Sequence, residues 1–205
     1  MKKLLVAALL TAAATGSIAQ NQPMPRNYVG IEGGYAWVDI KAAETAQALA
    51  NASGRTTTYS YDKATPFGRL FGGINVHQYV DIEAGVFTTG NLTANYSNSL
   101  GTASESYSAT GFDLSIVLRP EPTGFFVKLG GHNSRVDGNA SVRISTYSAS
   151  ASASKTGSGF FGALGYDFKF TNDIVGSVGY SYYDKVGGLD GVNASIVSFG
   201  ISKKF

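Results

Sequence analysis

Apolar and polar residues alternate along most of the chain. Between residues 79 and 88, Val80, Ile82 and Ala84 share one face and Asp81 and Glu83 share the other. A period of two is typical of a β-strand with one apolar side. A strand that crosses a bilayer at about 45° needs about 9–11 residues, and each segment is close to that length. Strands are predicted at residues 27–40, 66–76, 79–88, 107–118, 125–134, 159–168, 174–183 and 193–205.

The connections between these segments alternate in length. Short ones are predicted at residues 77–78, 120–123 and 169–173. Long ones are predicted at residues 41–65, 90–106 and 136–156, with an intermediate one at 184–192. Short turns at one end and long loops at the other are typical of an outer-membrane barrel. The Ser-Ala alternation from Ser148 to Ser154 leaves open that two strands extend above the membrane, and Asp137-Gly138 is a candidate local turn.

The composition of the two faces distinguishes a membrane barrel from a soluble one. Large apolar side chains gather on one parity, whereas Gly, Ser and Ala dominate the other. Charged residues make up 15% of the chain, against about 25% in soluble domains, so the alternative of a secreted β-sandwich is disfavoured. We therefore predict an all-β fold, a closed antiparallel up-and-down transmembrane β-barrel of about eight strands. Four aromatic residues near strand ends are candidates for an interfacial girdle: Tyr35, Trp37, Tyr180 and Tyr182.

The first residues have the pattern of a secretory signal peptide. Lys2 and Lys3 precede an apolar run, and Ser17 and Ala19 fit a cleavage site. We predict a signal peptide at residues 1–19 and one barrel domain at residues 20–205. The two lysines account for the net charge of +2, so the mature chain is close to neutral and nucleic acid is not an expected partner. The chain has no cysteine, so no disulfide stabilises it.

Several motifs resemble those of the outer-membrane protein A (OmpA) barrel family. The sequence from Leu70 to Gly85 contains F-G-G-x-x-V-x-x-Y-V-x-x-E-x-G, which resembles the hairpin between that family's second and third strands. K-L-G-G at residues 128–131 and G-Y-D-F at residues 165–168 are further matches. The resemblance implies eight strands with both termini in the periplasm, surrounded by outer-membrane lipid and lipopolysaccharide. Many members of that family carry a peptidoglycan-binding domain after the barrel; none is expected here, since the sequence ends at Phe205.

The last strand carries a second feature of that family, a terminal aromatic residue. The resemblance implies that the barrel-assembly machinery recognises this strand during insertion. Lys203 stands where the family usually has an apolar residue, and a lysine there is able to extend toward the headgroups. The predicted assembly signal consists of Phe205, Ile201, Phe199 and Val197.

Five charged residues lie on the predicted lumen parity: Glu32, Arg69, Glu83, Asp113 and Lys128. An eight-stranded barrel is just wide enough for its own side chains, so these residues are predicted to form a hydrogen-bonded plug. The alternative is a narrow pore in which the ion pairs rearrange. Glu83 matches the family motif, whereas Gly165, Ser177 and Gly179 stand where other charged partners are found, so the pairing scheme stays open.

Catalysis is not predicted. His132-Asn133-Ser134 has the His-x-Ser spacing of some lipid A-modifying barrels, but its parity places it in the lumen and no acidic partner is evident. Neither a cofactor nor a metal is expected. The predicted role is that of an integral outer-membrane barrel with a structural or surface function, whose loops bind or adhere to an unidentified extracellular ligand. The alternatives are a narrow porin-like pore and, more remotely, a lipid A hydrolase.

Overall fold

The computed structural model describes residues 27–38, 42–120, 124–145 and 147–205. The predicted signal peptide lies outside these residues. None of the helices described is long and apolar enough to cross a membrane. The elements are β1 (Tyr28–Val38), α2 (Ala42–Ser53), β2 (Thr58–Tyr61), β3 (Thr65–His77), β4 (Val80–Thr89), β5 (Leu92–Asn98), β6 (Gly101–Leu118), β7 (Gly124–Ile144), β8 (Tyr147–Lys169), β9 (Ile174–Tyr183), η1 (Val186–Gly188) and β10 (Ala194–Lys204).

Eight of the strands form a closed antiparallel ring, which confirms the predicted fold class. Their order around the ring is β1, β3, β4, β6, β7, β8, β9 and β10. The ring closes where β10 pairs with β1, from Tyr28 opposite Lys204 to Val38 opposite Ala194. Closure satisfies the backbone groups of both terminal strands and leaves no open edge in the ring.

The two faces of the ring differ as the alternation predicts. On β6, Leu114 is 57% exposed on the outside, whereas Asp113 is 1% exposed in the lumen. An apolar exterior of this kind suits lipid rather than water. The four predicted girdle residues lie on the outer surface of neighbouring strands: Tyr35 and Tyr180 flank Val197, and Trp37 and Tyr182 flank Ser195.

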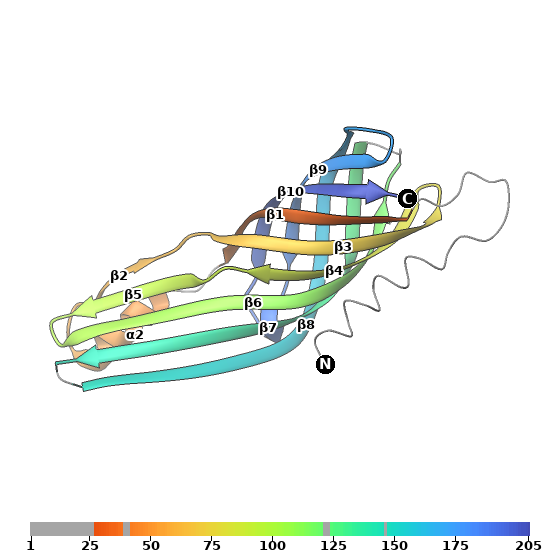
Figure 1. Cartoon of the computed structure of the whole chain (residues 1–205). Coiled ribbons are helices and arrows are strands. Elements are labelled where there is room, and N and C mark those ends of the chain that lie inside the picture. The colour runs from red at the N-terminus through yellow and green to blue at the C-terminus, as the bar shows by residue number, and fades with distance from the viewer. Residues whose placement is uncertain (1–26, 39–41, 121–123, 146) are drawn as a thin grey trace.

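Three strands of the ring, β6, β7 and β8, continue well beyond it. Together with β2 and β5 they form a five-stranded sheet in the order β2-β5-β6-β7-β8, which we call the extension sheet (Figure 1). The prediction of long loops at residues 90–106 and 136–156 is therefore wrong, and the alternative of extended strands is confirmed. The candidate turn at Asp137-Gly138 is also wrong, because Asp137 pairs with Ser154 in mid-strand. The Ser-Ala alternation continues the strand period, and this overrides the local turn signal.

The region predicted as a long loop at residues 41–65 contains α2 and β2. Ala46 and Leu49 of α2 pack against Ala94, Tyr96 and Ala103 of the extension sheet. The helical segment is rich in alanine, the residue with the highest helix propensity, but it lacks the long apolar stripe that would have identified it. The helix covers one face of the extension sheet and leaves the other open.

Candidate functional site

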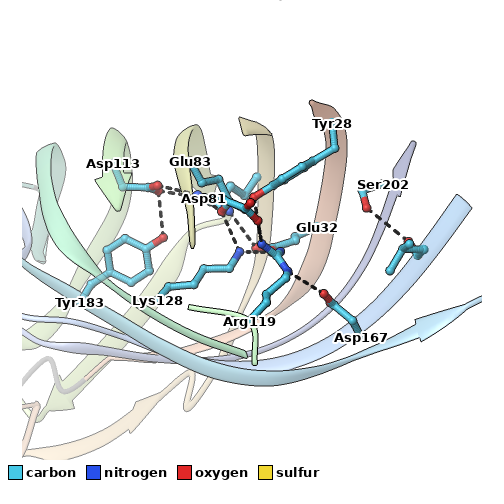
Figure 2. Close-up of polar contacts among 12 residues, drawn as sticks. Tyr28, Glu32, Asp81, Glu83, Asp113, Arg119, Lys128, Asp167, Tyr183 and Ser202 are labelled. Atoms are coloured by element: carbon cyan, nitrogen blue, oxygen red, sulfur yellow. Dashed lines mark hydrogen bonds and ion pairs between the residues drawn. The ribbon is translucent and has the colours of Figure 1, made fainter. Parts of the chain in front are cut away.

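The lumen brings the five predicted charged residues into one network, of which Glu32, Glu83, Asp113 and Lys128 are labelled in Figure 2. Arg69 is the centre: one guanidinium nitrogen, Nη2, lies 2.6 Å from Asp113 Oδ1 and 2.9 Å from Glu83 Oε1. The other, Nη1, donates to Glu32 Oε2 at 3.4 Å. Lys128 Nζ lies 2.7 Å from Glu83 Oε1 and 3.2 Å from Glu32 Oε1. Two cations thus share three carboxylates.

Strand register explains why these side chains meet. Glu32 on β1 lies directly opposite Arg69 on β3, and Glu83 and Asp113 lie on the adjoining strands β4 and β6. Gly85 provides the space for the guanidinium, because a Cβ at this position would lie 2.5 Å from Arg69 Nε. Buried charges are tolerated only when they are paired and hydrogen-bonded, and this network meets that condition.

A second charged layer lies beside the first and was missed by the sequence analysis. Arg119 forms an ion pair with Asp81 and lies 2.9 Å from Asp167, and its Nη1 lies 3.3 Å from the Tyr28 hydroxyl. Tyr28 in turn donates to Glu83 Oε2 at 2.9 Å and so links the two layers. Asp81 and Asp167 have the lumen parity and were identifiable from it. Arg119 has the lumen parity of Val117, but it lies one residue beyond the end of β6 and outside the predicted strand.

Aromatic side chains form the next layer of the lumen. The Tyr183 hydroxyl donates to Asp113 at 3.1 Å, and its ring lies 4.6 Å from that of Phe161 and 4.9 Å from that of Phe87. The prediction that small residues dominate the lumen is therefore incomplete. Its glycines make room for large rings on neighbouring strands: a Cβ at Gly73 would lie 2.2 Å from the Tyr28 ring.

The His-x-Ser pair binds a loop instead of facing lipid. His132 Nε2 lies 2.7 Å from the Asp184 carbonyl oxygen, and Ser134 Oγ accepts a hydrogen bond from the Gly187 amide at 2.8 Å. Both side chains hold the η1 segment inside the barrel mouth, where Val186 is buried. Between this segment and the aromatic layer lies an apolar cavity of about 260 Å³. No cluster of metal-binding side chains occurs among the described residues.

The open face of the extension sheet is a polar surface built by strand alternation. Across the five strands, Ser60, Asn95, Ser104, Ser141 and Ser150 lie in one row of directly paired residues. The rows on either side of it are also polar: Ser97, Thr102, Arg143 and Ser148 on one side, and Thr93, Ser106, Asn139 and Ser152 on the other. We call this surface the hydroxyl face. Hollows of about 650 Å³ and 330 Å³ are lined largely by its residues.

The covered face of the extension sheet carries a small network around Glu105. Its carboxylate accepts hydrogen bonds from Tyr107 at 3.0 Å and from Tyr96 at 3.4 Å. Burial, reinforced by the negative charge of Glu105, raises the pKa of Tyr107 to about 12. Both tyrosines therefore remain donors at neutral pH and help to fix β5 against β6.

Comparisons with known proteins agree with this geometry. A family model described as outer membrane protein beta-barrel domain matches residues 5–205. Among solved structures, the chain is similar to Ail, the attachment invasion locus protein of Yersinia pestis, with 16% identity and a TM-score of 0.54 over 89% of this chain and 99% of that one. At this identity the likeness shows the fold alone.

Two other solved structures resemble the chain more weakly. Neisserial surface protein A has 17% identity and a TM-score of 0.48, over 87% of this chain and 97% of that one. OprG from Pseudomonas aeruginosa has 14% identity and a TM-score of 0.44, over 91% of this chain and 99% of that one. No curated protein matches the chain.

Proposed function

Since the chain belongs to the family of outer membrane protein β-barrel domains, we propose that it is a closed barrel that displays a polysaccharide-binding surface outside the cell. Its location is the outer membrane, where the barrel is surrounded by lipid and lipopolysaccharide. The start of β1 at Tyr28 and the end of β10 at Lys204 are paired at the end of the barrel opposite the extension sheet (Figure 1), as expected for a sheet that faces the exterior.

The hydroxyl face is the observation that carries the binding role. It presents Ser, Thr and Asn side chains at alternate positions on five adjacent strands, and each of them is able to donate and to accept hydrogen bonds. A sugar chain also presents hydroxyl groups at regular intervals, and the hollow of about 650 Å³ has room for several of its units. Because the strands hold these side chains at fixed spacings, little ordering entropy is lost on binding.

The test compares the intact barrel with one that lacks the tip of the β7–β8 hairpin. Replacing residues 139–152 with Asn-Gly joins Gly138 and Ala153, which are already paired, through a two-residue turn. On a glycan array, the purified intact barrel is expected to retain neutral polysaccharides and the shortened barrel to lose them. Equal binding by the two proteins would exclude the part of the hydroxyl face on β7 and β8 as the binding surface.

The lumen supports a non-conducting barrel rather than the alternative of a pore. Two layers of ion pairs and a layer of aromatic rings lie across it, and η1 occupies the mouth. Purified protein in a planar bilayer is therefore expected to give no steady conductance. A reproducible conductance that changes with Glu83→Ala would instead support the pore.

The barrel is also proposed to have no catalytic activity. His132 and Ser134 are buried, bind the backbone of the loop and face the lumen, whereas an enzyme that cleaves lipid A must reach an acyl chain. Mass spectrometry of lipid A from cells with and without the protein is expected to give identical spectra. A loss of acyl chains that depends on Ser134 would establish the hydrolase.

A further inference from the structure

One edge of the extension sheet has no partner strand. Within the ring, β8 pairs with β7 on one side and with β9 on the other, but the pairing with β9 begins only at Phe161. From Tyr147 to Lys155, β8 pairs with β7 alone, and among the described residues no backbone hydrogen bond reaches its other side. At Gly157 the η1 segment comes close and ends this open stretch. The free edge therefore runs from Tyr147 to Lys155.

From Ser148 to Ser154 the free edge lacks the features that normally prevent strand pairing. Proteins usually protect an exposed edge with lysine, proline, a bulge or a covering segment. Between Ser148 and Ser154 the edge contains only serine and alanine, and its register with β7 is continuous, without a bulge. The opposite edge of the same sheet, β2, is only four residues long. From Ser148 to Ser154 the β8 edge is thus an uncharged row of unpaired amide and carbonyl groups, and Lys155 is the one charged residue of the free edge.

The sequence of this edge is a palindrome centred on Ala151. Reading outward, Ser150 and Ser152 follow first, then Ala149 and Ala153, then Ser148 and Ser154. A two-fold axis at Ala151 therefore places serine opposite serine on the hydroxyl face and alanine opposite alanine on the other face. Ala151 is also the midpoint of the stretch between Tyr147 and Lys155. An edge that matches itself in this way is suited to an isologous contact.

We propose that the β8 edge binds a second copy of the chain by antiparallel strand pairing centred on Ala151. The pairing joins two extension sheets into one continuous sheet. Because antiparallel strands run in opposite directions, the two barrels lie at opposite ends of the joined sheet. The two copies therefore belong to membranes that face each other, and the contact links neighbouring cells. This inference goes beyond polysaccharide binding, since it uses the edge of the sheet and not its hydroxyl face.

Cysteine substitution tests the register directly, because the chain has no cysteine of its own. Paired residues on antiparallel strands have Cα atoms about 4.5–5.5 Å apart, within the range of a disulfide. Refolded full-length Ala151→Cys protein is expected to form a disulfide dimer under mild oxidation. Ala149→Cys and Ala153→Cys, on the same strand and face, are each displaced from their own copies by about 13 Å and should form no disulfide between copies. An equimolar mixture of these two variants is expected to form a mixed dimer.

These controls make the proposal refutable. Absence of a dimer from Ala151→Cys would overturn it. So would equal dimer formation by Ala149→Cys alone, since that result would show non-specific contact. Dimers of Ala151→Cys that form on cells kept apart in dilute suspension would place both copies in one membrane, which contradicts the facing geometry.

A charge test in cells addresses the link between membranes. The double variant Ser150→Lys, Ser152→Lys places like charges opposite each other across the two-fold axis, and pairing should weaken about tenfold. The matched control is Ser104→Lys, Ser106→Lys, in the same two rows of the hydroxyl face but on β6, two strands from the edge. Two differently labelled cell populations should form mixed clumps with the control and not with the edge variant. Equal clumping by both variants would reject the contact.

Discussion

The outer face of β8 passes through two environments on one continuous strand. In the ring, Phe160 and Leu164 point outward and are exposed; above it, residues of the same parity are serines, such as Ser150 and Ser152. Backbone geometry and pairing with β7 do not change along this length. The side chains change because one half faces lipid and the other faces water. The same change occurs on β6 between Phe112 and Ser108, so the membrane boundary can be located on both strands that flank β7.

The largest expected difference in stability is between an ion pair in the lumen and an ion pair on the extension sheet. Arg69→Met leaves three carboxylates in the lumen without their guanidinium and should cost about 3–5 kcal/mol of barrel stability. Arg135→Met breaks an exposed pair with Asp137 on the extension sheet and should cost less than about 1 kcal/mol. Urea unfolding in lipid vesicles, followed by the fluorescence of Trp37, measures both. Similar costs would mean that water reaches the lumen network.

A charge on the outer face of β6 should cost more stability in the half that faces lipid than in the half that belongs to the extension sheet. Leu114→Arg places a cation in the middle of the lipid-facing segment and should cost about 2–4 kcal/mol. Ser104→Arg, on the same strand and parity but in the extension sheet, should be nearly neutral. The same unfolding measurement applies. A neutral Leu114→Arg would show that this face of the barrel is not in contact with lipid.

Shortening the extension sheet should leave the ring intact. Replacement of residues 139–152 by Asn-Gly removes no pairing between ring strands below Gly138, so the free energy of unfolding should change by less than about 1 kcal/mol. The expected readout is a normal shift in gel mobility on boiling and an unchanged unfolding midpoint. A large loss of stability would show that the ring and the extension sheet unfold as one cooperative unit.

The smallest expected change in stability concerns the last residue. Phe205 is half-exposed, and its amide donates to the Asn27 carbonyl at the rim of the barrel. Burial of a whole phenylalanine side chain contributes about 1.5–3 kcal/mol, so deletion of this partly exposed ring should leave the unfolding midpoint almost unchanged. Insertion in cells should nevertheless fall, because the ring is predicted to be an assembly signal for the barrel-assembly machinery. Normal insertion with a lower midpoint would make the ring a structural contact instead.

The alternation of apolar and polar residues in the sequence by itself determined that the chain forms a barrel. A period of two repeated over eight segments specifies which side chains face lipid and which face the lumen, because a strand places successive residues on opposite sides. It also placed Glu32, Arg69, Glu83, Asp113 and Lys128 in one interior. What it did not specify was the partner of each charge, since partners come from strands that are distant along the chain.

Only the tertiary structure decided which side chains pair, which strands are neighbours and where an edge stays free. Arg119 lies one residue beyond the end of β6, and only the positions of Asp81 on β4 and Asp167 on β8 reveal that its side chain enters the lumen. From its sequence, the Ser-Ala segment was also compatible with a hydrated loop. In the structure it is a strand, because its backbone pairs with β7 on one side. Local sequence specifies the face of a side chain, whereas hydrogen bonds between distant strands specify register, neighbours and free edges. These last properties exist only once the strands have paired.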